Sequence, residues 1–357
     1  MKTTKRFLAL ALILTLALSL AACGGGAAPA APAAPAAPAA PGADAPPAAA
    51  PAGQPVTLRF ANIFPQDMYQ SLGMAMFKEL VEARSENITV DLFFNGVLGT
   101  ETEIVESLAA GTIDMAASGS GMQIFIPNVL ASEMPFIFDD WDHAQRVLLD
   151  PRYKEMISRA GFDHNIKMLG FCPNGFRMIS SSVPVRTMDD FRGFRLRLPN
   201  IPHFLQMGEA LGAAYVALPL TEVFTALEQG VVDGQENALI MTITSRFYEM
   251  QDYIIVTRHM LSTHAWYINT NFFDSLTPED QQIILESFDE AIQFVWDSTL
   301  HAEEDWIAYT EAAGLTIIRL DDATMAEMQE ASSAVWEWYT GINPEGRELI
   351  DFIRAAA

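Results

Sequence analysis

The sequence has few cysteines and few basic residues for its length. Its 357 residues include two cysteines, too few for a disulfide framework or for a zinc site built from four thiolates. Only 21 Lys and Arg stand against 45 Asp and Glu, so the formal charge is −24 at pH 7. Nucleic-acid binding depends on clustered basic side chains that contact phosphates. The composition therefore argues against a nucleic-acid partner and against a fold held together by cysteines.

The sequence also lacks the common catalytic and nucleotide-binding motifs. It contains no H-E-x-x-H, no G-x-S-x-G, no P-loop and no G-x-G-x-x-G followed by an acidic residue. Its six histidines are scattered along the chain. His259 and His264, five residues apart, do not have the pattern of a metal site. We therefore expect neither a metal ion nor a cofactor.

Only one long apolar run is present, and it lies near the N-terminus. Two lysines and an arginine precede the apolar residues 7–20, and Ala-Ala-Cys23 follows. A basic start, a short apolar segment and small residues before a cleavage site predict a secretory signal peptide over residues 1–22. The residues before Cys23 also resemble a bacterial lipobox, in which this cysteine is lipidated. The alternative is an ordinary signal peptide followed by an unrelated cysteine.

A spacer is expected after the signal peptide. Residues 23–55 are almost entirely Ala, Pro and Gly, a composition that cannot bury a core and favours an extended linker. With a lipid on Cys23, this segment predicts a folded part tethered to the extracytoplasmic face of the cell membrane. No later apolar run is long enough to span a bilayer. The remaining thiol, Cys172, is expected to be a small buried apolar side chain.

The rest of the chain has the composition and the alternation of an α/β protein. Half of the residues are apolar, and the length exceeds one average domain, so we expect about two domains. Strands are predicted at 56–60, 88–94, 112–117, 166–171, 177–181 and 194–198, and helices at 68–84, 101–110 and 277–313. Strands that alternate with helices predict sheets covered by helices on both faces.

The last of these helices is predicted to be unusually long. Thr277 is a suitable N-cap, Pro278 suits the first helical position, and Glu279 and Asp280 place acids in the first turn. The helical pattern then continues to about residue 313, where Gly314 provides a stop. A helix of this length could lie across two domains.

Arginines are concentrated in one part of this acidic chain. Five of them lie between residues 172 and 197, and each can bind a carboxylate with two parallel hydrogen bonds, which Lys cannot do. Arg177 and Arg197 lie among apolar strand residues, and a buried guanidinium needs a counter-charge. The other three are expected to be solvated surface residues: Arg186, Arg192 and Arg195.

Five ordered motifs occupy residues 174–237. They are N-G-F-R at 174–177, D-F-R-G-F-R-L-R-L-P at 190–199, A-L-G-A at 210–213, L-P-L-T-E-V-F-T-A-L-E-Q-G at 218–230 and V-V-D-G-Q-E-N at 231–237. Together they closely resemble the substrate-binding subunits of TRAP transporters, the DctP-like family. The resemblance extends from about Val56 to the C-terminus and includes residues 98–101 and 110–114.

The resemblance implies a two-lobed fold like that of periplasmic binding proteins, with a hinge and a long helix spanning both lobes. Lobe I is expected to comprise residues 56–174 and 263–302, and lobe II residues 175–262 and 303–357. Such a protein closes over a small organic acid and delivers it to the membrane subunits of a TRAP transporter. It performs no chemistry of its own.

The resemblance also implies roles for individual residues. Arg197, the arginine of an R-x-P motif, is the expected anchor that pairs with the ligand carboxylate. Asn237 is expected to orient this arginine and the ligand, Arg177 to be a second ligand contact, and Asn62 to supply a polar contact from the other lobe. Ser118 falls near a variable position that carries an acid in some relatives.

Two departures from the family pattern leave the identity of the acid open. Leu220 stands where the family often has an aromatic residue, and Phe224 replaces a customary tyrosine. Phe64, Phe176 and Leu220 are expected to form apolar walls of the ligand site. A C4-dicarboxylate, a keto acid, a sugar acid or another monocarboxylate all remain possible ligands.

Glu222 has two possible roles. We expect Thr221 to cap a helix and Glu222 to begin it, where an acid interacts favourably with the helix dipole; direct contact with the ligand is the alternative.

Two further alternatives for the function remain open. A secreted lipoprotein lyase or hydrolase would use Glu222 or Glu101 with the arginines, but no nucleophile–base pair is evident. A binding protein of the ABC type would share the architecture, but the motif block argues against it.

Overall fold

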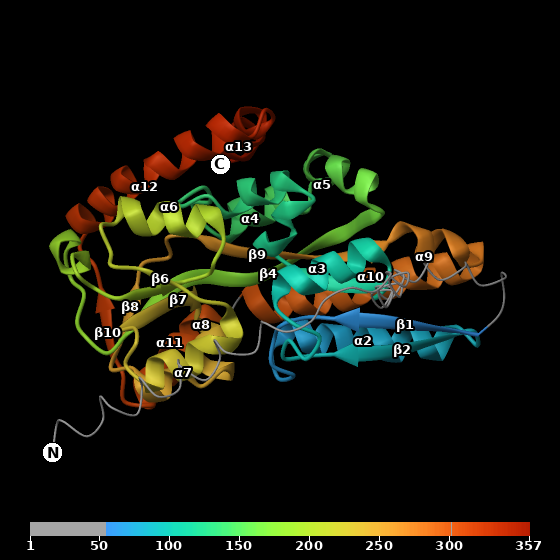
Figure 1. The fold of residues 1–357 in the computed structure, drawn as a ribbon, viewed down its shortest axis with the longest axis horizontal. Coiled ribbons are helices and arrows are strands. Elements are labelled where there is room, and N and C mark those ends of the chain that lie inside the picture. The colour runs from blue at the N-terminus through green and yellow to red at the C-terminus, as the bar shows by residue number, and fades with distance from the viewer. Residues whose placement is uncertain (1–54, 301) are drawn as a thin grey trace, which may run out of the picture. The chain divides into compact units, whose positions relative to one another are not determined.

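The computed structural model describes residues 55–300 and 302–357. The predicted signal peptide, the lipidation of Cys23 and all but the last residue of the linker therefore lie outside the described residues. From Val56 onward the chain alternates strands and helices, which confirms the predicted α/β class (Figure 1).

Ten strands form the sheet of the described part of the chain. Eight of them follow the order β2-β1-β3-β9-β4-β7-β5-β6, while β8 pairs with β4 and β10 pairs with β8. The strands are β1 (Val56–Ala61), β2 (Ile88–Phe93), β3 (Met115–Ser118), β4 (Ile166–Ser181), β5 (Leu196–Leu198), β6 (Val216–Ala217), β7 (Gly234–Ala238), β8 (Tyr253–Val256), β9 (Leu261–Asn269) and β10 (Thr316–Arg319).

The helices of the described residues lie on both faces of these strands (Figure 1). The α-helices are α2 (Tyr69–Arg84), α3 (Glu101–Ala110), α4 (Trp141–Leu148), α5 (Pro151–Ser158), α6 (Pro202–Ala210), α7 (Val223–Glu228), α8 (Leu239–Thr244), α9 (Thr270–Ser275), α10 (Pro278–Leu300), α11 (Glu303–Ala312), α12 (Asp322–Ile342) and α13 (Gly346–Arg354). Short 3₁₀ helices are η1 (Ser120–Ile124), η2 (Pro127–Glu133), η3 (Arg159–His164), η4 (Met188–Phe191), η5 (Leu220–Glu222) and η6 (Phe247–Met250).

Strand β4 joins the two parts of the sheet. The first part of β4 pairs with β9, and its last residues pair with β7 and β8. The sequence predicted two separate strands here, at 166–171 and 177–181, but β4 is one strand of 16 residues. Its pairing with β9 shifts register twice, once next to Gly170 and once between Pro173 and Gly175. These residues are typical of strand irregularities, which explains why the sequence suggested a break.

The N-terminal part of the sheet packs against α2 and α10. Helix α2 approaches α10 so closely that a Cβ on Gly73 would lie 2.5 Å from Cγ2 of Val295. Aromatic rings fill the space between these helices and the strands, with Phe60 and Trp266 at a centroid distance of 4.9 Å. Cys172 is buried in the same cluster, as the sequence predicted.

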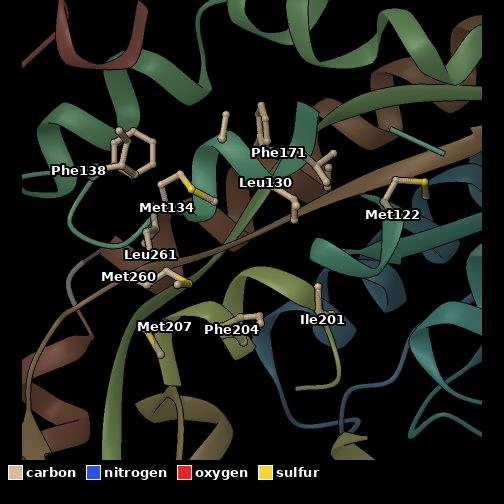
Figure 2. Close-up of a cluster of buried hydrophobic side chains, with 14 of the residues drawn as sticks. Met122, Leu130, Met134, Phe138, Phe171, Ile201, Phe204, Met207, Met260 and Leu261 are labelled. Atoms are coloured by element: carbon tan, nitrogen blue, oxygen red, sulfur yellow. The ribbon is translucent and has the colours of Figure 1, made fainter. Parts of the chain in front are cut away.

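The largest core cluster lies around η2, β9 and α6. Figure 2 shows three of its side chains: Met134 just after η2, Met260 just before β9, and Phe204 of α6. Helix α12 packs over α6 on the outside of this core (Figure 1). Methionine and aromatic side chains fill irregular space well, and this cluster continues directly into the cavity described below.

The predicted long helix spanning both lobes is two helices. Helix α10 ends at Leu300, and α11 begins at Glu303. The backbone N–H of Ala302 bonds to the carbonyl of Thr299, three residues before it. Helix α10 packs on α2 and β4, whereas α11 packs on α8 and β10. The interruption thus lets each helix follow its own part of the sheet, which one straight helix could not do.

Among the described residues, none of the helices combines the length and the apolar character that crossing a bilayer requires.

Candidate functional site

A cavity of about 240 Å³ is lined by residues from widely separated parts of the chain. The β1–α2 connection, the start of α3 and the end of η2 contribute to it, as do β4, β5, β7 and β9. Four of the residues predicted for the site line this cavity: Arg197, Arg177, Asn237 and Leu220. Phe64, one of the predicted apolar walls, also borders it.

Arg197 is a buried cation that faces this cavity without a neutralising acid. It lies in the middle of β5 and is only 2% exposed. Its Nε and Nη2 donate to the carbonyl oxygen of Leu218 at 2.9 and 2.6 Å, and no carboxylate of the described residues lies within ion-pair distance. Burial lowers the pKa of Arg197 to about 9 against the attraction of Glu236, so it stays charged at neutral pH. A buried charge of this kind calls for a counter-ion.

Arg177, in contrast, is already paired. Its Nε and Nη2 donate to the two carboxylate oxygens of Glu236, the latter at 2.8 Å, and its Nη1 donates to Oγ of Ser262 at 3.2 Å. The guanidinium also lies over the ring of Phe204, 4.7 Å from its centroid. The counter-charge that the sequence predicted for this arginine is therefore Glu236.

The Arg177–Glu236 pair follows from the sheet register. Ile179 of β4 faces Glu236 of β7, so Arg177, two residues earlier, is a diagonal neighbour on the same face. Burial opposes the ionisation of Glu236, but the Arg177 charge and His259 outweigh it and lower the pKa of Glu236 to about 2. The pair is therefore a fixed, neutralised part of the cavity wall.

Asn237 makes its side-chain hydrogen bond to Gln235 and not to Arg197, which the resemblance expected it to orient. Its Nδ2 donates to Oε1 of Gln235 at 2.9 Å, and Gln235 in turn donates to Ser180 and Thr242. No hydrogen bond joins Asn237 to Arg197 in the described residues. Asn237 therefore presents an oriented amide to the cavity, and its network holds β7, β4 and α8 together.

Two acids that the site prediction did not include border the same cavity. Glu101, the first residue of α3, accepts hydrogen bonds at Oε1 from Oγ of Ser118 (2.8 Å) and from the backbone N–H of Gly119 (2.7 Å). Glu133, at the end of η2, accepts at Oε1 from the N–H of Thr263 at 2.9 Å. Glu133 is the only acid between residues 126 and 138, and an isolated acid in an apolar segment is a signal that could have identified it.

Glycines make room for the side chains at this end of the cavity. A Cβ on Gly121 would lie 2.6 Å from Cγ of Glu101, and one on Gly119 would lie 2.9 Å from the ring of His264. In the segment S-G-S-G at residues 118–121, glycine is therefore required at 119 and 121, because two cavity-lining side chains pack directly against the backbone there.

The structure places Asn62 and Ser118 outside the cavity lining. Nδ2 of Asn62 donates to Oγ of Ser71 at 3.0 Å, and its Oδ1 accepts from the N–H of Phe64 at 3.1 Å. The amide therefore holds the β1–α2 connection. Ser118 is bonded to Glu101. Asn62 and Ser118 act on the site indirectly, by positioning residues that do line it.

Phe176 and Glu222 are also absent from the lining. Phe176 directly precedes Arg177 in β4, and neighbouring strand residues point to opposite faces. Its ring contacts Trp141 and lies under the guanidinium of Arg258. Glu222 is exposed at the end of η5. Helix α7 begins at Val223, so the prediction that Thr221 caps a helix beginning at Glu222 was wrong.

The described residues contain no group of three or more His, Cys, Asp and Glu side chains placed to hold a metal ion. The lining combines one arginine without an acidic partner, one neutralised arginine, two acids, amides, serine and threonine hydroxyls, His264 and apolar side chains. It offers binding groups for a polar solute, and within the described residues no hydrogen bond joins one of its hydroxyl groups to His264.

The α/β layers and this cavity define a two-lobed solute-binding protein of the periplasmic type. The chain belongs to the family of bacterial extracellular solute-binding proteins, family 7 (DctP), whose sequence model matches residues 60–341. A solute-binding protein of Verminephrobacter eiseniae is 32% identical to this chain over 86% of it and 91% of the relative. Members of this family are binding proteins and not enzymes.

The similar proteins whose ligands are named bind different compounds. The C4-dicarboxylate-binding protein DctB of Bacillus subtilis is 27% identical over 83% of this chain and 85% of the relative. A TRAP periplasmic solute-binding protein of Haemophilus influenzae, solved with bound L-gulonate, is 29% identical, with a TM-score of 0.80 over 84% of this chain and 99% of the solved chain. Membership of the family therefore leaves the kind of acid open.

Proposed function

We propose that this protein is an extracytoplasmic receptor that binds the carboxylate of a small organic acid at Arg197 and delivers the acid to TRAP membrane subunits. The observation that carries the proposal is a guanidinium only 2% exposed, at a cavity, with no acidic partner in the described chain. The planar fork of Arg suits a carboxylate, which can accept two parallel hydrogen bonds from it. The bound L-gulonate of the Haemophilus influenzae structure supports the same class of ligand.

The cavity residues divide between the two proposed lobes. Phe64 and Glu101 fall in lobe I (residues 56–174 and 263–302), and Arg197 and Leu220 fall in lobe II (residues 175–262 and 303–357). A ligand that contacts both groups binds the closed arrangement better than an open one and shifts the population toward it. Strand β4 pairs with both parts of the sheet and would supply the hinge.

Closure is needed on energetic grounds. A micromolar dissociation constant corresponds to about −8 kcal/mol, whereas one charge-assisted hydrogen bond contributes roughly 1.5–3 kcal/mol. The remaining affinity must come from removing water around the ion pair and from apolar contacts with Phe64, Phe204 and Leu220, all of which line the cavity.

The binding proposal is tested with a library of organic acids. Native mass spectrometry and thermal-shift measurements would compare the purified protein with its Arg197→Met variant. The proposal expects at least one carboxylate to bind the wild type and to lose its effect in the variant. If no acid binds, or if the same acids bind both proteins equally, the proposed function is wrong.

We also propose that the mature protein is anchored by a lipid on Cys23, with residues 24–55 as its tether. The support is the basic, apolar and small-residue pattern before this cysteine and the Ala/Pro-rich segment after it. Expression of the full chain and of a Cys23→Ser variant, followed by membrane fractionation and mass analysis of the N-terminus, tests this. A wild-type chain that is released without a lipid would contradict the anchor.

A further inference from the structure

The charges around the cavity are unbalanced in favour of acids. Glu101 and Glu133 both line it, and Arg197 is the only lining arginine that lacks an acidic partner within the described chain, because Arg177 is paired with Glu236. A ligand that brings one carboxylate to Arg197 leaves two acids of the protein facing the same enclosed space.

Glu133 is held in a form that can accept hydrogen bonds but cannot donate them. Burial by itself would raise its pKa, but the imidazoles of His203 and His264 and the charge of Arg177 lower the pKa of Glu133 below its ordinary value. Its carboxylate is therefore ionised at neutral pH. An ionised carboxylate accepts hydrogen bonds only.

Two buried acceptors of cavity-lining residues make no hydrogen bond within the described residues. Glu133 uses Oε1 for the N–H of Thr263, whereas its Oε2 makes no hydrogen bond and has Nε2 of His203 only at the longer, ion-pair distance of 3.5 Å. Asn174, which is 1% exposed and also lines the cavity, has no donor for its Oδ1. A buried acceptor without a donor is costly, so these atoms favour a ligand that carries donors.

On the basis of the proposed function, we infer that the cavity selects acids with a single carboxylate whose other polar groups donate hydrogen bonds. Glu133 and Glu101 exclude a second carboxylate. Hydroxyl groups and an ammonium group share the required chemistry, because both donate to the oxygens of Glu133 and Asn174. A second carboxylate would add an acceptor where acceptors already lack donors, and would place like charges together in an enclosed site.

Matched acids test the inference directly. Threonate and tartrate differ only at the last carbon, which is a CH2OH group in threonate and a carboxylate in tartrate; galactonate and galactarate differ in the same way. Calorimetry at pH 7 should show that the monocarboxylate of a pair binds at least tenfold more tightly. The terminal-amino analogues of threonate and galactonate show whether the preferred donor is hydroxyl or ammonium.

Two variants test whether the acids cause this selectivity. Glu133→Gln and Glu101→Gln keep an acceptor oxygen for Thr263 and for Ser118, respectively, but remove a negative charge. Each should reduce the preference for the monocarboxylate at least tenfold, while Glu222→Gln, an exposed acid outside the lining, should leave it unchanged. Thermal unfolding without ligand verifies that each variant is folded; Glu101→Gln, at a half-buried position, serves if Glu133→Gln does not fold.

These experiments distinguish a failure of the selectivity inference from a failure of the proposed function. Equal or tighter binding of the dicarboxylates, or an unchanged preference in the folded Gln variants, overturns this inference and leaves the receptor function standing. If no acid of the matched pairs or of the wider library binds in a way that depends on Arg197, the proposed function fails and the inference fails with it.

Discussion

Arg177 and Arg197 line the same cavity, but their surroundings differ. Arg177 is bonded to both oxygens of Glu236 and to Ser262. Arg197 is bonded to a single backbone carbonyl, that of Leu218, within the described residues. Both are nearly fully buried, at 4% and 2% exposure. Burial therefore does not decide the role of either arginine; the presence or absence of an internal counter-charge does.

In the proposed function, this difference assigns Arg177 to stability and Arg197 to binding. Removing one partner of a buried ion pair leaves an uncompensated charge, so Arg177 contributes to the fold. A buried cation without an acid destabilises the empty protein, and a bound anion removes that cost. Removing this destabilisation at Arg197 would therefore contribute to the free energy of ligand binding.

The largest effect on folding is expected for Arg177→Met. The variant leaves Glu236 buried without its main counter-charge, so unfolding in urea should require about 3–5 kcal/mol less free energy. Arg197→Met is the matched control, because it removes a buried charge that has no acidic partner; its stability should be unchanged or higher. If the two variants are destabilised equally, the contrast between the arginines is wrong.

Low pH should destabilise the fold through the Arg177–Glu236 ion pair. The pKa of Glu236 is about 2 in the folded protein and about 4.3 in an unfolded chain. Because the folded value is lower, the stabilisation is fully present above about pH 4.3 and is lost as the pH falls toward 2. The shift corresponds to roughly 3 kcal/mol.

Carbon-13 NMR of the Glu236 carboxyl group, with urea unfolding at each pH, would measure this effect. An ordinary pKa for this carboxyl group would contradict the account.

Alkaline pH should weaken ligand binding before it weakens the fold. Burial lowers the pKa of Arg197 to about 9, and a bound carboxylate stabilises the protonated form and raises this pKa again. Affinity for a carboxylate should therefore be constant up to about pH 9 and fall above it, by up to about tenfold per pH unit. Calorimetric affinities between pH 7 and 10.5 test this; a constant affinity up to pH 10.5 would contradict the low pKa.

The smallest effect is expected for Glu222→Gln. Glu222 is exposed, lies outside the cavity lining and makes no hydrogen bond that caps α7. Its replacement should change stability by less than about 0.5 kcal/mol and leave acid binding intact. A clear loss of affinity, measured by calorimetry with an acid that binds the wild type, would show that this residue reaches the ligand after all.

Local signals in the sequence predicted individual elements well. Helix α3 has the predicted bounds, 101–110, because Thr100 and Glu103 form a capping box at its start and Gly111 adopts a left-handed conformation at its end. The need of Arg177 for a counter-charge was also visible, because it stands among apolar strand residues. Arg186, Arg192 and Arg195 are exposed, as predicted.

Features that depend on distant parts of the chain were harder to predict. Pro173 and Gly175 suggested a strand break, but pairing with β9 continues across them. The interruption between α10 and α11 depends on which strands and helices each one meets, which no local pattern records. The site acids Glu101 and Glu133 are 32 residues apart in sequence, so only the fold shows that they share a cavity with Arg197.

Calorimetry on Arg197 variants tests the central claim most directly. With an acid that binds the wild type, Arg197→Ala should lower the affinity by about 3–5 kcal/mol, and Arg197→Lys should also bind poorly because a point charge cannot replace the planar fork. Both variants should remain folded in thermal unfolding. A loss of less than tenfold in the folded Arg197→Ala protein would show that Arg197 does not anchor the ligand.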